Sequence, residues 1–546
     1  MKFLRIFCLA ALLACSLQLF SQEDQHHHHD MSELGTVAFP ISCAKNSQAP
    51  FELGMALLYS FEYEQAARQF ESTAKSDPQC AMADWGQAMS LYHQLWSRPT
   101  PNQLSQGWSL IEKARTLKPA TQRERDYIDA LASFYRDAAS VSHEKRAEEY
   151  STAMGKLSAT YPEDHEAAVL YALSLLALDN RNDPTLANPK KAVSILNALF
   201  VSEPNHPGVA HYIIHACDNP KMASMGLAAA RHYAEIAPAS PHATHMPSHI
   251  FARLGLWQDD IHSNLAALAD TDKDAAMGMN MAHHRLHSID FLEYAYLQIG
   301  DDTDAKAMAD RAKDFHRDDL EEDLRSYYDY SAAHLPAMYV VETHSWKEAL
   351  ALRSPEGLAP YGQAITDWAH AVAAGHLRDS ASAQAALAHF NVMLEEVRKS
   401  SRPYQADDMA TNQEEATAWT EFAEGKSEEG LKRLRGVADH QDAVGKREVE
   451  LPAREMVGDM LLQLNRPKEA LAEYERSLQS DPNRFNGLYG AARAAELANQ
   501  PKKAADYYAQ LLKNCEGTAS DRPELKQART QVAAISKTDY SLALRR

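Results

Sequence analysis

Cysteine is scarce in this chain of 546 residues, and none of the six cysteines belongs to a CxxC motif or to a zinc-ribbon spacing. A structural zinc of the ribbon type needs two such pairs, so this class of site is excluded. Cys8 and Cys15 lie in an apolar N-terminal run. In an oxidising compartment Cys43 and Cys80 can pair and close the first helical hairpin, or both can serve as small buried hydrophobic residues.

Positive charge is also in deficit. The chain has 75 acidic and 55 basic side chains, which gives a formal net charge of −20. A nucleic-acid-binding surface needs net or clustered Lys and Arg, and no such stretch is present, so we expect no nucleic-acid partner. The apolar fraction of 45% and charged fraction of 24% are those of a folded, soluble protein.

Long apolar runs are absent except at the N-terminus. Lys2 and Arg5 precede an uncharged run over residues 6–20, which is too short for a membrane span and typical of a secretory signal. We therefore expect residues 1–21 to be a signal peptide and the mature protein to be exported, periplasmic or secreted. An alternative uses Leu12-Leu13-Ala14-Cys15 as a lipidation site, which would anchor the protein to the outer membrane through Cys15.

Alternating strand patterns are almost missing, whereas a helical repeat is evident. Gly458, Ala470 and Tyr474 recur 34 residues later as Ala492, Ala504 and Tyr508. The spacing is that of a tetratricopeptide repeat, in which small residues allow two helices to cross closely and an aromatic residue fills the space below. The same pattern occurs near the N-terminus at Gly54, Ala66 and Phe70.

These patterns predict an all-α fold, a right-handed superhelical solenoid of degenerate tetratricopeptide helix-turn-helix hairpins. We expect a signal peptide over 1–21, a polar His-containing leader over 22–39, a degenerate repeat array over 40–400, a linker and helical hairpin over 401–450, two well-formed repeats over 451–515 and a C-terminal tail or helix over 516–546.

Several stretches resemble a known family. They are ISCAKNSQAPFELGMALLYSFEYEQAARQF, HSIDFLEYAYLQIG and PHATHMPSHIFARLGLW, the last carrying the distinctive motif HMPSHIFARLG. The chain is similar to a widespread group of exported bacterial tetratricopeptide-repeat proteins of unknown biochemical function. The resemblance implies a helical-repeat fold and an envelope location, and it assigns no catalytic residue.

Histidines gather in the middle of the chain. His211 and His215 are four residues apart, as are His245 and His249, so each pair shares one face of a helix. With His242 they form a candidate metal site on successive first helices of the hairpins, and zinc, copper or nickel suits such ligands. Alternatively, these side chains hydrogen-bond to neighbouring carbonyl or carboxylate groups, or act as acids and bases. His283, His284, His287 and Asp290 follow on the next unit.

No catalytic motif is complete. His165-Glu166 lacks the second histidine of HExxH, and Gly425-Lys426-Ser427 lacks the first glycine of a phosphate loop. We therefore expect no enzyme and no certain cofactor, with zinc or copper as the possible ligand. The leading hypothesis is a scaffold of the bacterial cell envelope that binds a peptide or protein in a concave groove. The alternative is a metal-binding or metal-dependent protein that uses the histidine cluster.

Overall fold

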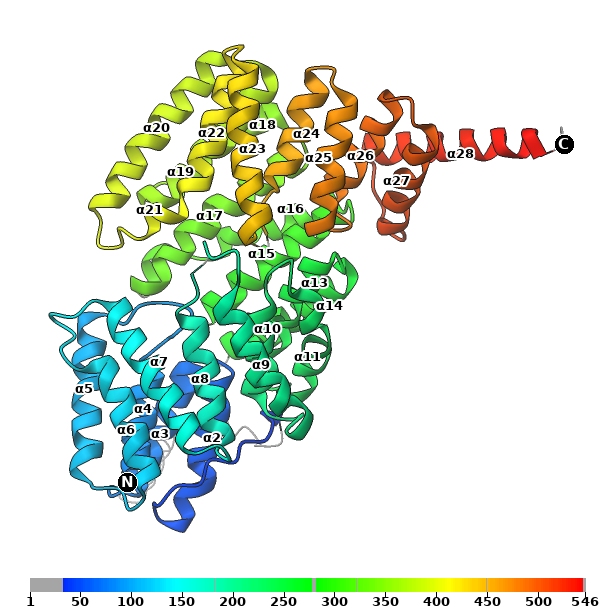
Figure 1. Cartoon of the computed structure of the whole chain (residues 1–546). Helices are drawn as coiled ribbons and strands as arrows, with labels where there is room; N and C mark the ends of the chain where they lie inside the picture. Colours follow the sequence, from blue (N-terminus) through cyan, green and yellow to red (C-terminus); the bar gives the residue numbers. More distant parts are fainter. Residues whose placement is uncertain (1–32, 181, 277–280, 321, 448, 544–546) are drawn as a thin grey trace, which may run out of the picture.

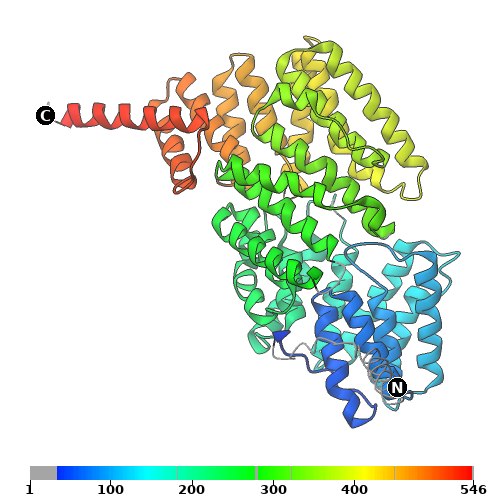
Figure 2. The same ribbon diagram turned by 180° about the vertical axis from the view of Figure 1, so that it is seen from behind.

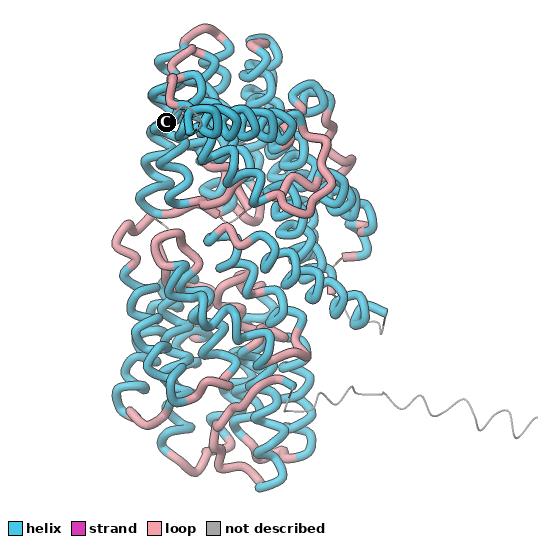
Figure 3. Tube along the Cα trace, turned by 90° about the vertical axis from the view of Figure 1, so that its right-hand side faces the viewer, coloured by secondary structure: helices cyan, strands magenta, loops and turns pink. Residues whose placement is uncertain are grey.

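The computed structural model describes residues 33–180, 182–276, 281–320, 322–447 and 449–543. Within these ranges every long element is an α-helix and no strand occurs (Figure 3). The prediction of an all-α solenoid is therefore confirmed. The signal peptide, the possible lipid anchor at Cys15 and His26 to His29 lie outside the described residues and stay predictions.

The helices follow one another as antiparallel hairpins. The N-terminal half contains α2 (Gln48–Tyr59), α3 (Tyr63–Ser76), α4 (Ala81–Ser90), α5 (Pro101–Thr116), α6 (Gln122–Tyr135), α7 (His143–Thr160), α8 (His165–Ala177), α9 (Ala187–Ser202), α10 (Pro207–Cys217), α11 (Ala223–Ile236), α12 (Pro241–His245) and α13 (Pro247–Leu254).

The C-terminal half contains α14 (Trp257–Ala276), α15 (Ala282–Gln298), α16 (Asp302–Asp310), α17 (Glu322–Glu342), α18 (Trp346–Ala351), α19 (Pro360–Leu377), α20 (Ser380–Lys399), α21 (Gln405–Asp408), α22 (Ala410–Ala423), α23 (Ser427–Val444), α24 (Ala453–Gln463), α25 (Pro467–Ser480), α26 (Phe485–Leu497), α27 (Pro501–Asn514) and α28 (Pro523–Ala543). Short 3-10 turns lie at Lys45–Ser47, Arg311–Asp314 and Arg317–Asp319.

Each well-formed hairpin is built around one aromatic side chain. The ring of Tyr474 on α25 lies between Gly458 of α24 and Gly490 of α26, where added Cβ atoms would approach it to 2.6 Å and 2.3 Å. Phe70 lies in the same way between Gly54 and Gly86. Only glycine leaves room for a ring at such helix crossings, which explains the residue pattern of the repeats.

The described residues form two large hydrophobic cores and two small satellite clusters. One large core takes its buried residues from positions 34–251 and the other from positions 252–528. Figure 1 shows the corresponding halves one above the other, with α13, α14 and α15 between them, and Figure 2 shows the same arrangement from behind. The chain therefore changes from one core to the other in the segment that carries the predicted histidines.

The N-terminal half closes on itself. Its first helix, α2, contacts α10, and the Tyr59 hydroxyl at the end of α2 donates to the Glu166 carboxylate of α8. His206, which caps α10, lies 3.4 Å from the same carboxylate. Helices far apart in sequence thus line one buried interior, and the expected open concave groove is filled here by the chain's own side chains.

The predicted polar leader is shorter than expected. Leu34, Val37 and Phe39 are buried in the N-terminal core, and the amide of Ala38 donates to Glu166 at 3.2 Å. Assigning all of residues 22–39 to a solvated leader was wrong from Leu34 onward, because three apolar side chains among polar neighbours are enough to bind this segment to the helices.

Cys43 and Cys80 form a disulfide across the first hairpin. Cys217 and Cys515 are buried free thiols. Among the described residues, no helix is both long enough and apolar enough to cross a bilayer.

Candidate metal centre

Eight histidines gather at the junction of the two halves, and six of them form two groups of three, with His283 and His284 beside them. The six come from α10 (His211 and His215), α12 (His242 and His245), α13 (His249) and α15 (His287). Helix α12 ends after His245, and Pro247 begins α13. Because proline cannot donate a backbone hydrogen bond, the break falls there. Met246 keeps helical dihedral angles, so His245 and His249 still lie one turn apart on the same face.

The first group, here called the His211 cluster, consists of His211, His215 and His242. The Nε2 atom of His211 lies 3.0 Å from Nε2 of His242 and 3.1 Å from Nε2 of His215. On its other side, Nδ1 of His211 lies 2.6 Å from the carbonyl oxygen of Tyr59. A carbonyl only accepts, so Nδ1 carries the proton and Nε2 presents its lone pair to the other two rings.

The second group, here called the His245 cluster, consists of His245, His249 and His287. The Nε2 atoms of His245 and His249 are 3.1 Å apart. Ligand atoms of all three residues lie within 4.8 Å of one another, as do those of the His211 cluster. Nδ1 of His287 lies 2.8 Å from the Tyr327 hydroxyl on α17.

The tautomers of His245 and His249 are fixed by their outer partners. Nδ1 of His245 lies 2.6 Å from Oδ1 of Asn264, and the amide nitrogen of Asn264 donates to the Asp260 carboxylate at 2.7 Å, which sets the orientation of the amide. Nδ1 of His249 lies 2.9 Å from the Asp218 carboxylate. Both rings therefore donate from Nδ1 and turn Nε2 toward the other ring.

The ring spacings lie on both sides of those expected for one coordinated ion, and only the His249–His287 distance falls within the expected range. Three imidazoles bonded to an ion at about 2.1 Å hold their ring centroids roughly 5.2–5.5 Å apart. The centroids are 4.7, 4.8 and 6.4 Å apart in the His211 cluster. They are 4.4, 5.1 and 5.4 Å apart in the His245 cluster.

Burial keeps the imidazoles of His211, His242 and His245 neutral. Desolvation lowers the pKa of His211 to about 3, against the small raising effect of the Tyr59 carbonyl. Desolvation, reinforced by neighbouring histidines, also holds the pKa values of His242 and His245 well below the usual range. Neutral imidazole is the form that coordinates metals, so the resting state of the site is the binding-competent one.

Aromatic rings enclose the His211 cluster. Phe61, at the end of α2, has its ring centroid 4.4 Å from that of His211 and 5.6 Å from that of His242. Tyr233 stacks on His211 at 5.1 Å, and Trp96 packs edge-on against His242 at 5.2 Å. The closure of the N-terminal half by α2 therefore also forms one wall of the site.

The structure divides the five predicted histidines between two clusters and adds a sixth histidine. His211, His215 and His242 lie in one, His245 and His249 in the other. His287 was placed on the next unit by sequence but was not included in the predicted site. The sequence feature that could have identified His287 is the 34-residue spacing between His249 and His283. His287 lies four residues after His283 and therefore on the same helix face.

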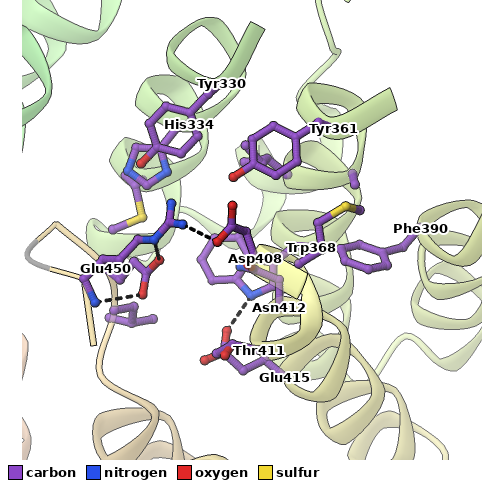
Figure 4. A pocket seen from close by; sticks show the side chains of 16 residues that line it. Tyr330, His334, Tyr361, Trp368, Phe390, Asp408, Thr411, Asn412, Glu415 and Glu450 are labelled. Carbon is purple, nitrogen blue, oxygen red and sulfur yellow. Dashed lines mark hydrogen bonds and ion pairs between the residues drawn. The ribbon is translucent and has the colours of Figure 1, made fainter. Parts of the chain in front are cut away.

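A different site occupies the C-terminal half. Figure 4 shows a pocket between α17, α19, α22 and the segment before α24, lined by Tyr330, Tyr361, Trp368 and acidic side chains. Arg447 lies in it, donating to Asp408 at 2.7 Å and lying 3.8 Å from Glu450. Sequence reasoning did not predict this pocket, because its residues are scattered over about 120 positions without a motif.

Comparison with known proteins gives one family match, over part of the chain, and structural neighbours of low similarity. No curated protein matches the chain. The solved structure of the human IFIT1 dimer with m7Gppp-AAAA is 11% identical, with a TM-score of 0.37, and the match covers 80% of this chain and 90% of that one. Naa15/Naa10 bound to HypK-THB is 10% identical, with a TM-score of 0.23, and the match covers 90% and 92% of the two chains. The tetratricopeptide repeat model matches residues 51–94 and 453–519, so the chain carries tetratricopeptide repeats in both halves of its helical solenoid.

Proposed function

We propose that this protein binds transition-metal ions, with the two histidine clusters as its ligands and the helical repeats as their scaffold. The observation that carries the proposal is the facing pair of Nε2 atoms of His245 and His249, 3.1 Å apart with both Nδ1 atoms bonded to acceptors. That spacing fits a shared cation, since nitrogens bonded to one ion at about 2.1 Å lie roughly 3.0–3.4 Å apart.

The outer contacts support the same conclusion. Metal-binding histidines usually donate their second ring proton to a carboxylate, a carbonyl or an amide oxygen, which orients the ring. His211, His245 and His249 use a backbone carbonyl, an amide and a carboxylate respectively.

The ligand set selects the class of metal. Six imidazole nitrogens without a cysteine suit zinc, copper or nickel better than calcium or magnesium, which require oxygen ligands. This is a proposal of binding and assigns no reaction.

Metal analysis of the purified full chain tests the proposal. His26 to His29 are first changed to serine, so that the N-terminal tetrad contributes nothing. We expect copper or zinc to bind, and His242→Gln and His249→Gln each to remove one ion per chain. His232→Gln is the matched control, because His232 lies on α11 outside both clusters and bonds to Glu235. A protein that binds none of zinc, copper and nickel, and whose melting temperature none of them changes, would refute the proposal.

A second candidate function is recognition of a protein or peptide, as the repeats indicate. The pocket of Figure 4 favours it, because aromatic rings line it and two carboxylates, Asp408 and Glu450, face the cation Arg447, while the buried Glu415 retains its proton. This excess of negative charge suits a basic side chain of a partner.

Capture experiments address this second function. We expect the full chain to capture a partner protein from an envelope extract at low salt. The double variant Asp408→Asn/Glu450→Gln should not capture this partner, and high ionic strength should prevent its capture by the unaltered chain. If the double variant retains every partner of the unaltered chain, recognition does not use this pocket.

The location in the bacterial cell envelope belongs to the same proposal. It is supported by the signal-like residues 1–21 and by the Cys43–Cys80 disulfide, since disulfides persist in oxidising compartments. Mass spectrometry of the mature N-terminus should show cleavage near Ser21, or a lipid-modified Cys15 if the protein is anchored. An intact Met1 in material from the cytoplasm would contradict export.

A further inference from the structure

We propose that the pocket of Figure 4 binds the terminal ammonium group of a lysine side chain that a partner protein inserts into it. This inference rests on the second candidate function, recognition of a protein by this pocket, and names the chemical group that is recognised. It follows from the volume of the pocket, from the charges of its lining and from its aromatic walls.

The pocket admits only the tip of a ligand. Its cavity volume is about 40 Å³, whereas a dry cavity of about 150 Å³ holds one benzene molecule with its six carbon atoms. By the same proportion the pocket accommodates about one or two non-hydrogen atoms. A nucleotide, a sugar or an aromatic side chain is too large, so the ligand is a narrow chain whose end enters the pocket.

The lining carries more negative than positive charge. Among the described residues that line the pocket, the carboxylates of Asp408 and Glu450 face one arginine, Arg447. Burial raises the pKa of Glu415 to about 8, so this fourth group is neutral at pH 7. The balance is one negative charge, which the single positive charge of an ammonium group offsets.

The lining also offers polar atoms to a bound group. Arg447 donates to Oδ1 of Asp408 at 2.7 Å, and among the described residues no donor contacts Oδ2 of the same carboxylate. Nε2 of His334 is buried without a hydrogen bond and lies 3.4 Å from Oδ1 of Asp290. Burial lowers the pKa of His334 to about 3, so the ring is neutral and does not repel a cation. Buried polar atoms are usually paired, and a polar group in the pocket gives this nitrogen a neighbour.

Aromatic walls favour an organic cation. Tyr330 of α17 and Tyr361 of α19 have nearly parallel rings with centroids 6.4 Å apart, and the indole of Trp368 is held by its bond to Glu415 at 2.8 Å. A cation within about 6 Å of such a ring is attracted to its face. The carbon atoms next to the ammonium group pack against the same rings. A hydrated inorganic ion lacks that apolar part.

A series of small ligands tests the inference on the unaltered full chain. Isothermal titration calorimetry compares lysine blocked at both ends with the blocked norleucine analogue, which lacks the charge, and with blocked trimethyllysine, whose head has five non-hydrogen atoms. We expect blocked lysine to bind with a dissociation constant of about 1 mM, and each analogue to bind at least about tenfold more weakly.

Two outcomes of this series would overturn the inference. One is binding of norleucine or trimethyllysine as tight as that of lysine. The other is far tighter binding of free 1,5-diaminopentane, which would replace the protein side chain as the source of the ammonium group. If no ligand binds while a captured partner is still lost with Asp408→Asn/Glu450→Gln, the inference fails and recognition by this pocket stands.

Charge variants test the physical reason. Asp408→Asn/Glu450→Gln should weaken the binding of blocked lysine by about tenfold or more, because it removes both carboxylates that face Arg447. Asp407→Asn is the matched control, since Asp407 is exposed on α21 beside Asp408 and does not line the pocket. If the double variant does not fold, the ligand series on the unaltered chain still decides. If it folds and binds lysine as before, the proposal is wrong.

Discussion

Arg484 illustrates at the residue scale how a charge is kept in the interior. Its guanidinium donates to Glu455 at 2.7 Å and to Glu342 at 2.6 Å, and it also bonds to the Tyr294 hydroxyl. All three charged side chains are almost completely buried. The three groups come from α17, α24 and the start of α26, so one network fixes three helices.

We predict that Arg484→Met destabilises the fold by about 3–5 kcal/mol, because two buried carboxylates lose their counter-charge. Urea denaturation, monitored by circular dichroism, measures this loss in the free energy of unfolding. Arg466→Ala is the control, since Arg466 forms exposed pairs with Glu469 and Glu428 that contribute under about 1 kcal/mol. Similar losses in both variants would show that burial does not control the effect.

Glu415 gives a pH prediction. Burial raises its pKa to about 8, while the bond from the Trp368 indole opposes the rise. The folded state therefore retains a proton that the unfolded chain releases above its own pKa, near 4.5. The resulting stability is complete below pH 4.5 and is lost as pH rises toward 8.

The Glu415→Gln variant should therefore become more stable relative to the unaltered protein as pH rises from 5 to 8, by up to about 1.4 kcal/mol per pH unit. Denaturant midpoints at both pH values measure this difference. Glu429→Gln, on an exposed face of α23, should show no such trend. A constant difference between pH 5 and pH 8 for Glu415→Gln would contradict an elevated pKa.

At the scale of elements, the repeats depend on glycines that contact aromatic rings. A Cβ atom at Gly490 would lie 2.3 Å from the ring of Tyr474. We predict that Gly490→Ala lowers the free energy of unfolding by about 1–3 kcal/mol through overpacking. The double variant Gly490→Ala/Tyr474→Leu should lose less stability than the sum of the losses in the two single variants, because removing the ring relieves the overpacking.

The control lies in another helix. Gly436 is an exposed glycine of α23 with open space around its Cβ direction. Gly436→Ala should stabilise the protein by about 0.5–1 kcal/mol, because alanine favours helix. Chemical denaturation compares the variants, and a loss at Gly436 equal to that at Gly490 would show that ring contact is not the cause.

The hairpins themselves were predictable from sequence. The 34-residue step places Gly458, Ala470 and Tyr474 correctly on α24 and α25, because local spacing fixes which helix face a side chain occupies. The contact of α2 with α10 was not predictable, since it joins segments about 150 residues apart. The packing of Leu34 and Phe39 was missed for the same reason.

At the scale of the whole molecule, the six histidines join the two hydrophobic cores. Helices α10 to α13 supply five of them beside the N-terminal core, and α15, which carries His287, belongs to the C-terminal core. An ion in the His245 cluster would link the two halves directly, because His287 and His249 would share it.

We therefore predict that a bound metal raises the thermal midpoint and makes both halves unfold together. Saturation at about a thousand times the dissociation constant would contribute about 4 kcal/mol. Differential scanning calorimetry with and without metal measures this, and a chelator should reverse it. His287→Gln should abolish the coupling while leaving one ion in the His211 cluster. Two separate transitions that metal leaves unchanged would contradict the link.

The sequence alone determined the helical hairpins, their 34-residue repeat and the helix faces that carry His211, His215, His245 and His249, because these depend on spacing within a few turns of helix. The tertiary structure alone decided that the imidazoles form two clusters, that His287 completes the second, and that Asp218, Asn264 and Tyr59 orient the rings. Those contacts depend on how distant helices stack and on where the first helix closes the N-terminal half, and no local pattern encodes either.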